Sequence, residues 1–385
     1  MDFAKVNISA GPFSRCHKVL LVYGTPYSAS NLWSDVPRTR YHLGAAQLSA
    51  ILKQRGIMAR LHFIQDWTDV ELQRLRRVIE DEHIDFVCFS VVSEDTFEST
   101  LPFMESARNM GRVVILGGSY LRFFNEVPDT PAHYTCRGDG ETLPEFILHG
   151  DTGLFDRALL TEDIDTLPLM DYEAMRPFFH LSMAETFTLP YLSSRDCPWS
   201  CSFCAESIHP RKKPRIRARV KEDIEYLYGN VFPRQITGVH FHGDLLPYYN
   251  QEWRESWGDI TFPFTACVRG DIEPDLVRWL CRRGANRVLI GVEDADEEYR
   301  NTVFNKQVTD RQLFDSIREF HKHGVFTELT FIVGAPGQGP ESQDRAQKLV
   351  KKIARRWRSK AQAGLNFCPY GSNSNLGQER TGTRT

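Results

Sequence analysis

Three cysteines in the middle of the chain have the spacing of a metal-binding motif. Cys197, Cys201 and Cys204 form a C-x3-C-x2-C run within the segment Asp-Cys-Pro-Trp-Ser-Cys-Ser-Phe-Cys. Three thiolates can hold one 4Fe-4S cluster and leave its fourth iron without a protein ligand, free to bind a small molecule. An open iron predicts chemistry rather than a purely structural role.

Two other interpretations of these cysteines stay open at this point. His209 lies five residues past Cys204 and could complete a four-ligand zinc site, or the three cysteines could be ordinary buried residues. Disulfides are not expected, because an odd nine cysteines are spread over 385 residues and the first 15 residues lack a signal-peptide hydrophobic segment. Cysteine usage therefore favours the reducing cytoplasm.

The composition predicts a folded, water-soluble protein. A length of 385 residues with 41% hydrophobic residues is enough for two ordinary domains, each with its own core. The net charge of −3 gives no overall attraction to nucleic acid or to anionic lipid. No apolar run approaches the ~20 residues that a membrane helix needs.

The elements that must position the cysteines are alternating strands and helices. In the first part of the chain, short apolar runs predict buried parallel strands, and the segments between them have helical periodicity. This alternation predicts a doubly wound α/β sheet. The expected strands are 18–23, 58–64, 84–90, 112–116 and 132–136, and the expected helices are 44–55, 70–81, 95–109 and one running toward 149.

The second part supplies six further strands with helices between most of them, which predicts a partial (β/α)6 barrel with its active site at the carboxyl ends of the strands. The cysteine run follows the first of these strands, where that rule places a site. The expected strands are 187–193, 238–241, 262–268, 287–292, 327–333 and 363–368, and the expected helices are 219–230, 273–283, 308–323 and 341–357.

The cysteine spacing, Phe203 just before the last cysteine and the strand leading into the loop together resemble the radical SAM superfamily. The resemblance implies that Cys197, Cys201 and Cys204 bind a 4Fe-4S cluster whose free iron chelates S-adenosylmethionine. An electron from the cluster would then cleave that molecule to a 5'-deoxyadenosyl radical. The protein would hold the cofactors and shield the radical.

The same resemblance implies an S-adenosylmethionine site at the carboxyl ends of the barrel strands. It would include Phe203, Asp244 after the second strand, Arg269 at the end of the third, and Glu293 in a Gly-Val-Glu segment after the fourth. A Gly-Ala-Pro-Gly turn at 334–337 resembles the family's glycine-proline-glycine turn. These residue types also fit surface ion pairs and turns.

Small and polar residues follow the strands of the first part, and the set resembles the cobalamin-binding domain that precedes many radical SAM cores. Glycines there would let a ligand approach the backbone, although they could equally be turns. The implied cobalamin-binding residues are Thr25, Ser90, Ser93, Gly117, Gly118, Ser119 and Gly138.

One departure from many cobalamin proteins concerns the lower ligand of cobalt. The D-x-H-x-x-G signature is absent after the first strand, where the loop reads GTPYSASNLW. We therefore expect a lower axial position that histidine does not fill. Tyr41 and His42, before the first helix, could face the corrin ring or pack in the core.

The resemblance covers residues 15–370 and divides them into domains. We expect a cobalamin-binding-like Rossmann domain at 15–150, a polar, proline-containing linker at 151–186, a radical SAM core at 187–370 and a mobile tail at 371–385. Relatives continue with a helical domain that helps to cover the substrate. A dimer or a partner protein could provide that cover here, or the chain could be a shortened homologue.

Three activities are compatible with this pattern. The first is a cobalamin-dependent methyltransferase acting on an unactivated carbon, or phosphorus, of a small molecule from a specialised biosynthetic pathway. The second is a cobalamin-associated enzyme that cyclises, contracts or oxidises its substrate. The third, a tRNA methylthiotransferase, would need three more suitably placed cysteines and an RNA-binding domain, which we do not find. All three would take electrons from a donor such as flavodoxin or ferredoxin.

Two other features have simpler interpretations. His240 and His242 alternate on one strand and share a face, so they could bind a metal, but a polar strand face is the preferred interpretation. The basic run 211–219 could contact RNA or phosphate, but a solvated face with Arg217 anchoring the loop is preferred. We therefore expect no nucleic-acid partner and no membrane association.

Overall fold

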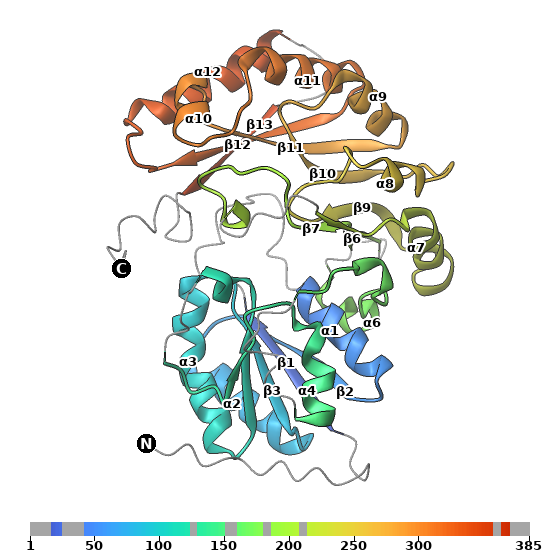
Figure 1. Ribbon diagram of the computed structural model, residues 1–385, viewed down its shortest axis with the longest axis vertical. Coiled ribbons are helices and arrows are strands. Elements are labelled where there is room, and N and C mark those ends of the chain that lie inside the picture. Colours follow the sequence, from blue (N-terminus) through green and yellow to red (C-terminus); the bar gives the residue numbers. More distant parts are fainter. Residues whose placement is uncertain are drawn as a thin grey trace. The chain divides into compact units, whose positions relative to one another are not determined.

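The computed structural model describes residues 17–24, 42–123, 129–150, 160–179, 186–207, 214–356 and 363–369. The chain divides into two compact units, each with its own sheet (Figure 1). The first unit comprises residues 1–162 and 166–179, and the second comprises 163–165 and 180–385. Among the described residues, no helix is long and apolar enough to cross a membrane.

The first unit is a five-stranded parallel sheet in the order β2-β1-β3-β4-β5. This is a doubly wound order, with α2 and α3 on one face and α1 and α4 on the other (Figure 1). Its strands are β1 (Lys18–Gly24), β2 (Met58–Ile64), β3 (Phe86–Ser90), β4 (Val113–Gly117) and β5 (Tyr134–Thr135), and its helices are α1 (Leu43–Gln54), α2 (Asp69–Asp81), α3 (Glu94–Asn109), α4 (Leu143–His149) and α6 (Tyr172–Met175).

Burial explains why these segments became strands. Helices cover both faces of the sheet, so its central strands must be apolar on both sides. In β1 the residues from Val19 to Tyr23 are all buried, and β3 is buried from Phe86 to Phe89. The core between the sheet and α2 and α3 includes Leu75, Phe103 and Met104. The expected α/β fold of this unit is confirmed.

The second unit is a six-stranded parallel sheet in the order β13-β12-β11-β10-β9-β6, open between its two edge strands. Strands and outer helices alternate along the chain, so the expected partial (β/α)6 barrel is confirmed. The strands are β6 (Phe187–Leu192), β9 (Ile236–His242), β10 (Phe264–Arg269), β11 (Ala285–Glu293), β12 (Phe326–Val333) and β13 (Ala363–Pro369), and the helices are α7 (Val220–Tyr226), α8 (Gln251–Glu255), α9 (Pro274–Arg282), α10 (Glu297–Thr302), α11 (Asp310–Lys322) and α12 (Glu341–Arg356).

Most expected boundaries lie within two residues of the observed ones. Strand β9 begins two residues earlier than expected, because buried Ile236 pairs with Phe187 of β6. Strand β5 is shorter than expected, at two residues. The helix expected at 219–230 is α7 followed by a turn of π-helix at Leu227–Val231.

The described residues of the expected linker at 151–186 pack as part of a core. Met170, Tyr172 and Met175 are all buried. The Asp171 carboxylate accepts hydrogen bonds from Ser49 and Lys53 of α1, both at 2.5 Å. The expectation that this segment contributes no core residues is therefore wrong for 166–179, which belongs to the first unit, while the domain boundaries stay a prediction.

Candidate functional site

The cysteine loop leaves the barrel through a short two-stranded ribbon. Strand β7 (Ser194–Arg195) pairs antiparallel with β8 (Arg215–Ile216), and Asp196 follows at once with a positive φ of 68°. The Asp196 carboxylate receives two hydrogen bonds from Arg215, Nε to Oδ2 at 2.7 Å and Nη2 to Oδ1 at 3.2 Å. Both side chains are buried, so this ion pair fixes the first residue of the loop.

The three cysteines of the motif are brought together. The thiol charges of Cys197, Cys201 and Cys204 influence one another, and Cys201 is buried while its two neighbours are partly exposed. Burial raises the pKa of Cys197 to about 11 and that of Cys204 to about 12, because a bare thiolate is poorly solvated there. An iron ion bound to the sulfurs would supply the missing positive charge, so the donor set fits a cluster.

A site for a single metal ion needs several ligand side chains arranged around one point. No group of three His, Cys, Asp or Glu side chains within the described ranges is arranged in that way. Ligands of one zinc ion must lie closer together than thiolates that each bind a different iron of a cluster. His209, the fourth ligand of the zinc alternative, lies outside the described residues.

A distant segment holds the cysteine loop in place. The Ser202 backbone N–H donates to the Phe304 carbonyl at 3.0 Å, and its hydroxyl donates to the Val303 carbonyl at 2.5 Å. Phe203 packs edge-on against Phe304, with ring centroids 5.2 Å apart. The side-chain amide of Asn305 donates to the Ser200 carbonyl at 2.9 Å. The sequence contained no signal for this contact, because about a hundred residues separate its two sides.

Arg269 reaches the cysteine loop from the end of β10. Its Nη1 donates to the sulfur of Cys201 at 3.6 Å, and its guanidinium lies 4.8 Å from the centre of the Trp199 ring. Asp271 accepts from Nε at 3.0 Å and from Nη2 at 3.2 Å, and the Lys306 carbonyl accepts from Nη2 at 2.6 Å. Arg269 is therefore a buried cation directed toward the sulfur of Cys201.

Glu293 is paired with a lysine that the sequence analysis did not identify. Lys306 Nζ donates to Glu293 Oε1 at 2.5 Å, and both side chains are nearly buried. Glu293 has a φ of 70° and lies at an irregularity of the β11–β12 pairing, which turns its side chain out of the strand alternation. A Cβ atom at Gly291 would lie 2.3 Å from Glu293 Oε1, so only glycine leaves room for this pair.

Asp244 lies near Cys197 of the cysteine loop. Its side chain is exposed, and its charge contributes to the raised pKa of the Cys197 thiol, which is due mainly to burial. Gly243, just before it, has a φ of 143°, and a Cβ there would lie 2.6 Å from the Ser194 hydroxyl. The sequence-predicted residues Phe203, Asp244 and Arg269 thus all lie around the cysteine loop.

The Gly-Ala-Pro-Gly turn after β12 is held by two side chains. Tyr299 donates its hydroxyl to the Pro336 carbonyl at 2.7 Å. Gln338 accepts from the Ala335 N–H at 3.0 Å and donates to the buried Asp294 carboxylate at 2.8 Å. Gly334 has a φ of 81°, which favours glycine. These contacts hold the turn, and its residue Ala335 packs with Phe304 and the partly buried Phe203.

Two other sequence interpretations are tested in this unit. The rings of His240 and His242 stack with centroids 4.2 Å apart, and burial lowers their pKa values to about 4 and about 3. Both are therefore neutral near pH 7. Within the basic run, the solvated-face expectation is wrong for Arg215, which is buried against Asp196. Arg217, for which an anchoring role was expected instead, is buried against Asp223 and also donates to the Ile164 carbonyl at 3.2 Å.

In the first unit, His42 and Ser90 lie together at the carboxyl ends of the strands. The Nδ1 atom of His42 accepts from the Ala45 N–H at 3.0 Å and caps α1, and its Nε2 lies 3.3 Å from the Ser90 hydroxyl. Both ring nitrogens are thus engaged within the protein. Tyr41 and Thr25 lie outside the described residues.

The remaining residues of the implied cobalamin set fall into two groups. Ser93 caps α3 through the Thr96 N–H, and a Cβ at Gly118 would lie 2.1 Å from the Val91 carbonyl oxygen. The fold itself therefore explains why a serine stands at 93 and a glycine at 118. At the same edge, a Cβ at Gly117 would meet nothing nearer than 3.8 Å, and Ser119 is exposed. Here the backbone could accept a ligand, as it could at the partly buried Gly138.

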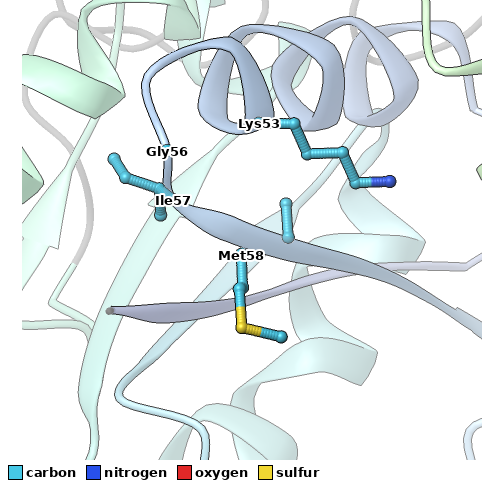
Figure 2. Close-up of a pocket in the computed structure, with 5 residues that line it drawn as sticks. Lys53, Gly56, Ile57 and Met58 are labelled. Carbon is cyan, nitrogen blue, oxygen red and sulfur yellow. The ribbon is translucent and has the colours of Figure 1, made fainter. Parts of the chain in front are cut away.

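A shallow depression of about 310 Å³ lies on the first unit, where α1 turns into β2 (Figure 2). Lys53, Gly56, Ile57, Met58 and Ala59 line it. It lies at the amino end of β2, opposite to the strand ends where doubly wound sheets bind ligands. Its lining offers a single ionisable side chain, so we assign it no part in catalysis.

Comparison with known proteins agrees with this site. Residues 191–350 match the model of the Radical SAM superfamily, a range that includes all three cysteines. An uncharacterized methyltransferase of Pyrococcus horikoshii is 22% identical over 369 residues, which cover 87% of this chain and 78% of that protein. The bacteriochlorophyllide d C-8(2)-methyltransferase of Chlorobaculum tepidum is 22% identical over 284 residues, 68% of this chain and 62% of that protein.

A solved structure resembles nearly the whole chain. The radical S-adenosylmethionine methyltransferase TsrM from Kitasatospora setae, solved with cobalamin and a 4Fe-4S cluster bound, has a TM-score of 0.69 and 15% identity. The match covers 96% of this chain and 76% of that one, so the two share a fold. The superfamily uses a 4Fe-4S cluster and S-adenosylmethionine. The chain therefore carries a radical SAM domain at residues 191–350.

Proposed function

We propose that the chain is a cobalamin-dependent radical SAM methyltransferase that acts on an unactivated carbon, or phosphorus, of a small molecule. The observation that carries the proposal is the cysteine loop that follows β6, with Arg269 on the buried Cys201, in a chain whose fold matches a cobalamin-bound methyltransferase over 96% of its length. The names of two relatives as methyltransferases support the same reaction.

The cofactor sites follow from this proposal. Cys197, Cys201 and Cys204 would hold the cluster, and Phe203, Asp244 and Glu293 would contact S-adenosylmethionine, with Glu293 oriented by Lys306. When bound, the cluster would supply an electron for cleavage of S-adenosylmethionine, and cobalamin would supply the methyl group. The protein residues would bind and orient these groups and exclude water from them.

Cobalamin would bind to the first unit at the carboxyl ends of its strands. The open backbone at Gly117 and the hydroxyls of Ser90 and Ser119 are the described groups available there, together with Gly138. Ser93 and Gly118 would shape this edge of the sheet rather than touch the ligand. Electrons would come from a donor of the flavodoxin or ferredoxin class, and we place the enzyme in the cytoplasm.

The first test is anaerobic reconstitution with iron, sulfide and hydroxocobalamin, followed by metal counts. We expect about four irons and one cobalt per chain. A triple Cys197→Ala, Cys201→Ala, Cys204→Ala variant should lose iron and keep cobalt, whereas Gly117→Val should lose cobalt and keep iron. Iron without cobalt in the wild type would rule out the cobalamin-dependent reaction, and zinc in place of iron would rule out the cluster.

A second measurement separates methyl transfer from the alternative cyclisation, contraction or oxidation. Loss of a methyl group converts S-adenosylmethionine to S-adenosylhomocysteine, whereas reductive cleavage releases 5'-deoxyadenosine. With a chemical reductant and a panel of candidate small molecules, a methyltransferase should form both products. Formation of 5'-deoxyadenosine alone, with cobalt present, would favour the alternative activity.

A further inference from the structure

The structure assigns to Arg269 a role in setting the reduction potential of the cluster, which it exerts through a hydrogen bond to the sulfur of Cys201. This inference rests on the cluster of the radical SAM domain and goes beyond the resemblance, which implied that Arg269 contacts S-adenosylmethionine. Arg269 is thus a positioning residue of the cluster.

The Arg269 guanidinium directs most of its N–H groups toward protein atoms. An arginine side chain carries five N–H groups, and Arg269 donates four hydrogen bonds to protein atoms. Asp271 receives two of them, the Lys306 carbonyl receives one at 2.6 Å, and the Cys201 sulfur receives one at 3.6 Å. Most of its donor capacity is therefore directed to the protein and to a cluster ligand rather than to a second molecule.

The Arg269 side chain is held rigidly in this position. Arg269 is only 5% exposed, and Asp271 fixes its plane through two roughly parallel hydrogen bonds. Trp199, inside the cysteine loop, lies against the guanidinium at 4.8 Å and packs edge-on against Tyr249 with centroids 5.2 Å apart. The arginine and the loop that carries Cys201 are thus locked to each other.

The positive charge of Arg269 would favour the reduced form of the cluster. Reduction adds one negative charge to a cluster, and part of that charge resides on its sulfur ligands. A cationic N–H donor on one sulfur stabilises the reduced form more than the oxidised form, and hydrogen bonds to sulfur are known determinants of cluster potential. Because Arg269 remains charged at every accessible pH, its effect does not depend on protonation.

The test is a potentiometric titration of the reconstituted full-length protein, with the reduced cluster followed by electron paramagnetic resonance. Arg269→Met should keep its iron and shift the midpoint to more negative potential. At the wild-type midpoint, we expect the ratio of reduced to oxidised cluster to fall about tenfold, which is about 59 mV for one electron. Arg269→Lys, which keeps a cationic donor, should recover part of the shift.

Two further variants make the result specific. Asp271→Asn removes the anion that faces Arg269 and should shift the midpoint in the opposite direction, to more positive potential, even if Arg269→Met fails to hold iron. Arg283→Met removes the same charge from the far end of the strands, where Arg283 lies over Trp279, and should leave the midpoint unchanged. If any loss of positive charge shifted the midpoint, without the hydrogen bond to Cys201, the Arg283→Met control would show a shift as well.

The inference and the proposed function fail in different ways. A wild-type protein that takes up no iron would overturn the cluster and the proposed function together. An unchanged midpoint in Arg269→Met at full iron content would overturn only the present inference. An unchanged midpoint with at least tenfold weaker binding of S-adenosylmethionine, measured calorimetrically, would return Arg269 to the role implied by the resemblance.

Discussion

Breaking the ion pair between Asp196 and Arg215 should destabilise the second unit strongly. The two side chains are 2% and 4% exposed, and they share hydrogen bonds of 2.7 and 3.2 Å. Arg215→Met leaves the Asp196 carboxylate buried without its cation, and removal of one partner of such a pair costs about 3–5 kcal/mol. A loss of ~4 kcal/mol changes the unfolding equilibrium roughly a thousandfold.

The assay is anaerobic urea unfolding of the iron-loaded chain, followed by tryptophan fluorescence. Four of the five tryptophans in the described part of the chain belong to the second unit, so the signal reports mainly on that unit: Trp199, Trp253, Trp257 and Trp279. A matched control is Lys221→Met, which removes a cation paired with the 86% exposed Asp259. The control should cost far less than Arg215→Met, because solvent screens an exposed pair.

The double variant Asp196→Leu, Arg215→Met tests whether the loss of stability comes from leaving one buried charge without its partner. With both charges gone, no buried carboxylate is left uncompensated, so the double variant should be more stable than Arg215→Met alone. A cost for Arg215→Met no larger than that of Lys221→Met would refute the reasoning. A double variant as unstable as the sum of the two single variants would refute it as well.

Three shorter predictions follow from other parts of the structure. Gly118→Ala, whose Cβ would meet the Val91 carbonyl at 2.1 Å, should cost ~3 kcal/mol or more in thermal unfolding, against ~1–2 for Gly111→Ala, which faces open space. Burial lowers the pKa of His240 to about 4 and that of His242 to about 3, so the unfolded chain binds protons first and stability should fall as the pH drops from about 6.5 toward 4. Urea unfolding at several pH values checks this, and a double His→Gln variant should show a shallower slope. Tyr191→Phe, which removes a 2.7 Å hydrogen bond to Asp223, should cost ~1 kcal/mol by the same assay, and a loss above ~3 would contradict it.

Strand positions were predictable because burial on both sides of a parallel sheet leaves a local apolar pattern. The run 58–64 was expected as a strand and is one, and the α1 and α2 helices begin within a residue of their expected starts. The packing of 166–179 was not predictable. The polar, proline-containing run 163–171 predicts a linker, but Asp171 contacts Lys53 and Ser49 of α1 only after the chain has folded.

The residues of the site were only partly visible in the sequence. The cysteines, Phe203 and Arg269 stood out by spacing and resemblance, whereas Lys306 and its neighbours gave no signal. The role of Lys306 depends on its 2.5 Å contact with Glu293, which needs both the turn after α10 and the irregularity at the end of β11. Such contacts arise from backbone geometry and not from a local motif.

The sequence by itself determined the cluster motif and the order of strands and helices, because ligand spacing and burial patterns are local properties of the chain. Only the tertiary structure decided which charges meet. Arg269 and Cys201 are 68 residues apart, and their contact depends on the order of strands in the barrel and on the path of the loop. The same holds for the basic run, in which Arg215 and Arg217 lie in buried ion pairs because folding brings Asp196 and Asp223 to them.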